Sequence, residues 1–191
     1  RSLWSEGYSR VMGLDEAGRG CLCGPVVAAG VVLRPGDGIA GVDDSKALTP
    51  GKREELSAVI QEKALFWAVR ELPAGEIDRL NILHASLTAM AQCAEAEGAD
   101  PDYLLVDGNR FHPVLVPHRC VVGGDASSMS IAAASILAKV HRDRIMVELD
   151  AACPGYGWAR NKGYPTREHY AAIQAHGVTP HHRRSFRLHR R

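Results

Sequence analysis

The sequence predicts an α/β domain in which a central mixed β-sheet is flanked by helices, followed by a helical and irregular C-terminal extension. Short β-branched runs such as residues 26–33 have the length of buried strands, whereas residues 77–94 carry apolar side chains at the spacing of a helix face. The two kinds of segment alternate along the chain, which is typical of helices packed on a sheet. We expect one main domain over residues 1–150 and an extension over 151–191 packed on it.

The first two strands are expected as a hairpin-like pair at the centre of the sheet. The apolar entry at residues 11–14 breaks at Asp15-Glu16, and a glycine-rich turn leads into the second strand. Further short strands are expected at residues 66–71, 103–106 and 119–122.

The helices are predicted from apolar spacing and from their end signals. Thr49-Pro50 is typical of a helix start, with threonine as the cap and proline at the first helical position. An Ala-rich helix is expected from Ser130 to about Leu149, capped by Asp125 or Ser127. The other expected segments are a single helix over 75–98, an irregular stretch over 153–166, a helix over 166–176 ended by Gly177, and a polar tail.

Composition limits the class of protein. The 191 residues are 46% hydrophobic and 24% charged, which argues against wholesale disorder. The longest apolar run, residues 26–33, is far shorter than the roughly 20 residues of a membrane helix, and no secretory leader precedes Val11. Five cysteines form neither a disulfide framework nor a paired zinc motif. We therefore expect a cytoplasmic protein that makes no membrane contact and whose cysteines are buried and reduced.

Charge is unevenly distributed although the net charge is only +1. Residues 181–191 hold five arginines and no acid, so a basic tail follows a mildly acidic body. This pattern favours contact with a polyanion, and a solvated tail is the alternative.

Acidic residues fall where strands are expected to end. Asp15-Glu16 follows the first strand, Asp107 follows the strand at 103–106, and Asp125 precedes the long helix. Ligands gather at strand ends in α/β sheets, and carboxylates without nearby His or Cys favour Mg²⁺ or Mn²⁺ over zinc. Two such ions can activate a water and stabilise the leaving oxygen of a phosphodiester. The alternative is that Asp15 and Asp107 are turn residues and Asp125 a helix cap.

The loop Gly18-Arg19-Gly20, followed by Gly24-Pro25, does not have the spacing of a dinucleotide or P-loop fingerprint. Glycines without a Cβ allow backbone N–H and C=O groups to reach a ligand directly. A ribose 2′-hydroxyl both donates and accepts, so a bare backbone suits it, and Arg19 could meet a phosphate. A purely structural turn is the alternative interpretation.

Taken together, these residues resemble the ribonuclease HII family, the type 2 ribonucleases H. The resemblance runs in order from about Val11 to Phe186, and the first segment alone is highly specific. The matching segments are residues 13–20 with 24–25, Asp44-Ser45-Lys46 with Leu48, 81–83 through 89–90, 106–109, 124–126, 131–140, Arg142-Asp143, Lys162-Gly163-Tyr164 with Thr166, and 182–186.

The resemblance implies a ribonuclease H-like fold with a helical C-terminal part. It implies that Asp15, Glu16, Asp107 and Asp125 are catalytic carboxylates that hold a divalent cation, Mn²⁺ or Mg²⁺. It also implies that Gly18, Arg19 and Gly20 read the 2′-hydroxyl, that Tyr164 recognises an RNA-to-DNA junction, and that Lys46 contacts a phosphate.

The implied substrates are RNA–DNA hybrids and duplex DNA that contains ribonucleotides, with no obligate protein partner. The implied cut lies 5′ of the ribonucleotide and leaves 3′-hydroxyl and 5′-phosphate ends, as in ribonucleotide removal and primer RNA degradation. Few residues precede Val11, which disfavours the type 3 enzymes with their N-terminal substrate-binding domain.

Small departures from the family pattern are Cys21 and Cys23 around Leu22, and Asn161 where histidine is common. Asp143 is expected to pair with Lys139 along the helix. His181 and His182 are expected to face solvent or phosphate, and Trp67 and Trp158 to pack.

Two rival functions remain from other classes. A catalytically silent hybrid-binding module would need none of the four acids, because carboxylates near a phosphate backbone weaken binding unless a cation intervenes. A metal-dependent phosphatase acting on small substrates would need neither the glycine loop nor the basic tail.

Overall fold

A computed structural model describes residues 2–42, 48–112 and 114–189. Within these ranges a five-stranded sheet has the strand order β3-β2-β1-β4-β5. The strands are β1 (Val11–Ala17), β2 (Val26–Val32), β3 (Phe66–Leu72), β4 (Tyr103–Asp107) and β5 (His118–Val121). The helices are α1 (Ser2–Ser5), α2 (Pro50–Lys63), α3 (Ala74–Leu80), α4 (Ile82–Ala94), α5 (Met129–Ala152), α6 (Trp158–Asn161) and α7 (Arg167–His176), with a 3-10 turn η2 (Gly124–Ala126).

The sheet is mixed, as the sequence predicts. Strand β1 pairs antiparallel with β2 and parallel with β4, which places it at the centre. The hairpin-like pair β1–β2 is therefore confirmed, and β3 extends it on the far side of β2. Strand β1 runs further than expected, because it continues through Asp15 and Glu16 to Ala17 while paired with β2.

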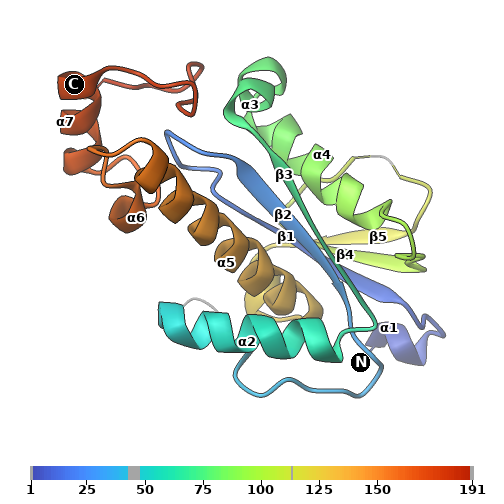
Figure 1. The fold of residues 1–191 in the computed structure, drawn as a ribbon. Helices are drawn as coiled ribbons and strands as arrows, with labels where there is room; N and C mark the ends of the chain where they lie inside the picture. Colours follow the sequence, from blue (N-terminus) through green and yellow to red (C-terminus); the bar gives the residue numbers. More distant parts are fainter. Residues whose placement is uncertain (1, 43–47, 113, 190–191) are drawn as a thin grey trace.

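The two faces of the sheet bury separate helical layers (Figure 1). Along β2, Val26 and Ala28 pack in the layer with α3 and α4, whereas Val27 and Ala29 pack against α2 and α5. This alternation follows from the two-residue period of a strand. A strand buried on both faces reads as a continuous apolar run, which explains the run at residues 26–33.

The expected single helix over 75–98 is wrong, because the chain breaks at Asn81. Asn81 has a φ of 64° and separates α3 from α4. Its side chain accepts a hydrogen bond from the backbone N–H of His84 and so caps α4. Asparagine tolerates positive φ and is a favoured cap, and the apolar spacing on either side conceals the interruption.

The start of α5 also differs from expectation. The helix begins at Met129, with Ser128 at the cap position and no side-chain cap bond. Asp125 instead lies in the 3-10 turn η2. Neither Asp125 nor Ser127 caps the helix, so the capping interpretation of Asp125 is wrong.

The described C-terminal residues, up to position 189, pack partly on the body, because His182, Arg183 and Leu188 are buried. Residues expected to be irregular include the short helix α6, whereas α7 begins after its Thr166 cap and ends at Gly177 as predicted. Trp158, Ile173 and Leu188 form a third core cluster with Leu22 and Cys23 from the loop after β1. In Figure 1 the far end of the β1–β2 hairpin lies toward α6 and α7. Within the described ranges, none of the helices could cross a membrane.

Candidate functional site

Two carboxylates lie level with each other on neighbouring parallel strands. Leu14 of β1 pairs with Val106 of β4, so Asp15 and Asp107 are the next residues along each strand. Leu14 and Val106 both pack in the α4 layer, and alternation therefore directs Asp15 and Asp107 to the face covered by α5. Asp107 ends β4, as predicted, whereas Asp15 lies within β1 rather than after its end.

The pKa values of the Asp15 and Glu16 carboxyl groups are both raised. Asp15 is only 6% exposed, and burial, with the nearby charges of Glu16 and Asp107, raises its pKa to about 7 despite a hydrogen bond with Ser135. Burial also raises the pKa of Glu16, opposed by its ion pair with Arg19 at 3.0 Å. The Oε2 atom of Glu16 is buried without a hydrogen-bond partner. A buried carboxylate oxygen without a donor and a carboxyl of raised pKa both suit a bound cation.

The raised pKa of Asp15 predicts how stability depends on pH when a chelator removes cations. A folded-state pKa above the unfolded value gives stability that is complete below about pH 4 and is lost as pH rises through about 7. The shift corresponds to roughly 4 kcal/mol. We expect urea unfolding between pH 4.5 and 8 to show this decline, and Asp15→Asn to flatten it. An equal decline in the variant would contradict the assignment.

Asp107 is linked to Asp125 through the turn between β5 and α5. The Oδ1 atom of Asp107 accepts a 2.7 Å hydrogen bond from the backbone N–H of Gly124. Asp125, the next residue, is buried in η2. Among the described residues, no three His, Cys, Asp or Glu side chains are already arranged to hold a metal ion. The structure thus brings Asp15, Glu16 and Asp107 within electrostatic range of one another. Asp125 directly follows Gly124, whose N–H binds Asp107.

The glycine loop and Tyr164 share a cavity of about 430 Å³ with Glu16. Gly18, Arg19 and Gly20 line it directly after β1. Tyr164 lies after α6 and is 42% exposed, and burial of the remainder raises the pKa of its hydroxyl. This tyrosine is therefore a protonated donor at neutral pH, with an open ring beside a loop of bare backbone.

The cavity also contains residues that sequence reasoning did not propose as site residues. They are Arg53 of α2 and Ser135, Ile136 and Lys139 of α5. The predicted pair of Lys139 with Asp143 is confirmed at 2.7 Å, and the Lys139 ammonium lies 5.8 Å from the centre of the Tyr164 ring. Two sequence signals mark Ser135 and Lys139: their four-residue spacing on one helix face and their place in the family-like segment 131–140. Lys46, the proposed phosphate contact, lies outside the described residues.

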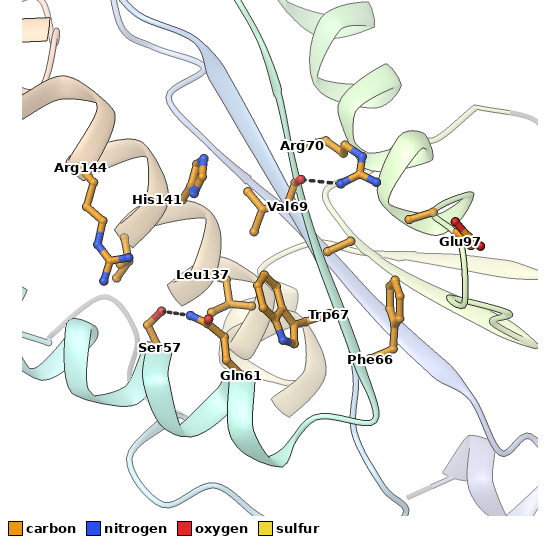
Figure 2. Close-up of a pocket in the computed structure, with 13 residues that line it drawn as sticks. Ser57, Gln61, Phe66, Trp67, Val69, Arg70, Glu97, Leu137, His141 and Arg144 are labelled. Carbon is orange, nitrogen blue, oxygen red and sulfur yellow. Dashed lines mark hydrogen bonds between the residues drawn. The ribbon is translucent and has the colours of Figure 1, made fainter. Parts of the chain in front are cut away.

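A second hollow lies beside the edge strand β3 (Figure 2), and none of the proposed site residues lines it. It has a volume of about 490 Å³ and is lined by residues of α2, β3 and α5, including Gln61, Trp67 and His141. Trp67 is 40% exposed there, so the expectation that it packs in the interior is wrong. Strand β3 is an edge strand, so no further strand covers this side of the sheet.

The sequence-based expectation is confirmed for Trp158 and wrong for His182. Trp158 is fully buried, as predicted, and donates a 3.0 Å hydrogen bond from Nε1 to Nε2 of His169. His182 is also buried, so the expectation that it faces solvent or phosphate is wrong. Burial lowers the pKa of His182 to about 4. The N–H of Thr179 donates to its Nδ1 atom, which makes His182 a neutral packing residue.

Comparison with known proteins identifies the family. The model of the family described as ribonuclease HII matches residues 12–189. The ribonuclease HII of Salinibacter ruber is 53% identical over 194 residues, covering 100% of this chain and 97% of that protein.

Solved structures show the same fold. The ribonuclease HII of Archaeoglobus fulgidus, solved in a complex with PCNA, has a TM-score of 0.78 at 26% identity and covers 95% of this chain and 97% of that chain. A Bst ribonuclease HIII solved with Mn²⁺ has the fold in common, with a TM-score of 0.69 at 20% identity, covering 95% and 68%. The predicted ribonuclease H-like fold is confirmed. The chain therefore belongs to the ribonuclease HII family and is a hydrolase that cuts the RNA strand of RNA–DNA hybrids.

Proposed function

We propose that this enzyme also cuts 5′ of a single ribonucleotide within duplex DNA, leaving 3′-hydroxyl and 5′-phosphate ends. The observation that carries this proposal is the shared cavity, in which the glycine loop, Glu16 and Tyr164 lie together. A 2′-hydroxyl reader beside an aromatic ring can distinguish a ribonucleotide followed by deoxyribose, because the ring packs where no 2′-oxygen intrudes. Such cuts would start ribonucleotide removal and would degrade primer RNA.

We further propose that Asp15, Glu16, Asp107 and Asp125 hold divalent cations, Mn²⁺ or Mg²⁺. The unpartnered Glu16 oxygen and the raised pKa of Asp15 support this, as does the Bst ribonuclease HIII, which was solved in complex with Mn²⁺. When bound, such ions lower the pKa of a water and stabilise the leaving oxygen. Among this chain's own groups, Ser135 orients Asp15, and the Gly124 N–H orients Asp107. Arg19 holds Glu16 until substrate phosphate competes for its guanidinium.

We propose that the enzyme needs no protein partner to cut its substrate, although the Archaeoglobus relative was solved bound to PCNA.

The five cysteines are free in the structure, which fits the proposed location in a reducing cytoplasm. We propose that the extension over 151–191 contributes Tyr164 to the cavity, whose other lining residues belong to the main domain.

Incubation with three duplexes tests the function and its rivals. The purified protein with Mg²⁺ or Mn²⁺ should cut a duplex with one ribonucleotide at its 5′ side, should cut an RNA–DNA hybrid, and should leave all-DNA intact. Binding to the ribonucleotide duplex without cleavage would support the silent binding module instead. Hydrolysis of small phosphate esters alone would support the phosphatase.

Removing the aromatic ring of Tyr164 should harm cutting at single ribonucleotides more than cutting of hybrids. We expect Tyr164→Ala to lower kcat/KM on the single-ribonucleotide duplex by about 10- to 100-fold, because stacking contacts are worth about 1–3 kcal/mol per base. Tyr170→Ala is a matched control, because Tyr170 lies on α7 outside the cavity. Steady-state rates on both substrates provide the measurement. Equal loss on both would remove Tyr164 from junction recognition.

A further inference from the structure

Two arginines are fully buried, and no described acid lies at ion-pair distance from either. Arg142 of α5 and Arg183 after α7 are both 0% exposed, and neither forms an ion pair with any described acid. Burial lowers the pKa of Arg183 to about 10, which leaves it cationic at neutral pH. A buried cation without a counter-charge is strongly unfavourable unless every donor is satisfied. The acceptors of these guanidinium hydrogen bonds therefore show which segments the two arginines hold together.

Arg142 binds three backbone carbonyls from two separate segments. Its Nε and Nη2 atoms donate to the carbonyls of Pro25 and Cys23, each at 3.0 Å. Its Nη1 atom donates at 2.9 Å to the carbonyl of Lys162. The same side chain lies against Gly18, where an added Cβ would be 2.1 Å from Nε. Arg142 thus contacts the glycine loop, the residues after it, and the segment that leads to Tyr164.

Arg183 holds the glycine loop from the C-terminal side. Its Nη1 atom donates at 3.1 Å to the carbonyl of Arg19, the middle residue of the loop. Its other nitrogens donate to the carbonyls of Gly24 and Pro25, at 3.0 and 3.1 Å. Pro25 is therefore a shared acceptor of both guanidinium groups.

A guanidinium group is planar and holds its donors in fixed directions. Carbonyls bound to one such group cannot move relative to each other without losing a charge-assisted hydrogen bond. A backbone bond from Leu22 N–H to the Gly163 carbonyl, at 2.8 Å, links the same two segments.

We propose that Arg142 is a positioning residue that fixes the spacing between the glycine loop and Tyr164, with Arg183 securing the loop against it. This inference rests on the proposed roles of the loop and Tyr164 in reading a ribonucleotide and the junction after it. On a single-ribonucleotide duplex both elements must engage adjacent sugars at once. On an RNA–DNA hybrid only the glycine loop contacts its sugar in this way, so a change in the spacing between the loop and Tyr164 should lower the cleavage rate less.

The test substitutes lysine, which keeps the charge but cannot reach three carbonyls in one plane. We expect Arg142→Lys to lower the ratio of kcat/KM on the single-ribonucleotide duplex to that on the hybrid by about tenfold, since a misplacement of about 1 Å can cost up to 100-fold. Arg183→Lys should lower the same ratio. Arg10→Lys is the matched control, because Arg10 donates to the carbonyls of Gly98, Ala99 and Asp100 far from the cavity. Its ratio should equal that of the wild type.

A double variant separates this proposal from the function on which it rests. If Arg142 acts through Tyr164, Arg142→Lys in a Tyr164→Ala background should change the ratio no further. Independent, multiplying effects would overturn the proposal, as would an unchanged ratio in both lysine variants. Loss of the native circular dichroism spectrum in both would assign the arginines to folding alone and would also overturn it. Failure of the wild type to cut single ribonucleotides, or an unchanged ratio in Tyr164→Ala, would instead contradict the proposed function.

Discussion

Replacing Asp107 with asparagine should lower the cleavage rate of the RNA–DNA hybrid and of the single-ribonucleotide duplex by more than about 100-fold. Loss of a residue that only hydrogen-bonds a metal ligand usually costs about 10- to 100-fold, and loss of a ligand itself should cost more. Asparagine removes the charge that Asp107 contributes beside Asp15 and Glu16. It retains an Oδ1 atom, which can still accept the Gly124 N–H that Asp107 accepts at 2.7 Å. The turn that carries Asp125 should therefore keep its place, and duplex binding should persist.

Asp102→Asn is the matched control for this prediction. Asp102 immediately precedes β4, at the opposite end from Asp107, and accepts backbone N–H bonds from Ser9 and Arg10. The same chemical change there should leave kcat per folded molecule unchanged. Single-turnover cleavage with both variants is the measurement. Substantial turnover by Asp107→Asn would show that this carboxylate does not hold the metal.

Among the proposed substitutions, Gly13→Ala should lower the free energy of unfolding most. Gly13 lies in β1 against the start of α5, and an added Cβ would be 2.2 Å from the Ser130 carbonyl carbon and 2.3 Å from the Ile131 nitrogen. Those atoms belong to the helix backbone and cannot turn aside. We expect the free energy of unfolding to fall by about 3 kcal/mol, at the upper end of the usual range for overpacking.

Gly51→Ala is the matched control for Gly13→Ala. Gly51 lies in α2 with open space where a Cβ would stand. Alanine in a helix is about 0.5–1 kcal/mol more favourable than glycine, so this variant should be at least as stable as the wild type. Urea unfolding of both variants gives the free energies. A neutral Gly13→Ala would mean that α5 does not approach β1 this closely, and that Ser135 is not held over Asp15.

Local sequence signals were sufficient for much of the fold and for the central acids. The β-branched run at 26–33 identifies a strand buried on both faces. Asp107 comes directly after a short apolar run, so its position at the carboxyl end of a strand can be predicted without knowing which strand lies beside it. The parallel pairing that sets Asp107 level with Asp15 is long-range and has no local signal.

Buried polar residues were harder to predict because burial depends on distant partners. Arg183 and His182 stand in a run of basic residues that resembles a solvated tail, yet both are buried. The carbonyls that the Arg183 side chain binds lie in the loop after β1, roughly 160 positions earlier in the chain. The backbone of His182 forms an isolated β-bridge with Cys23 of the same loop. Asn81 shows the opposite problem, since one residue of positive φ interrupts an otherwise continuous helical pattern.

The most direct test of the account is the location of Mn²⁺ in crystals of the protein, read from its anomalous scattering. If the four carboxylates hold the metal, a peak should lie within about 2.0–2.4 Å of carboxylate oxygens of Asp15 and Asp107, with Glu16 and Asp125 completing the site. The peak should be lost in Asp107→Asn. Full occupancy of Mn²⁺ at other carboxylates, in protein that still cuts ribonucleotide-containing DNA, would contradict the account.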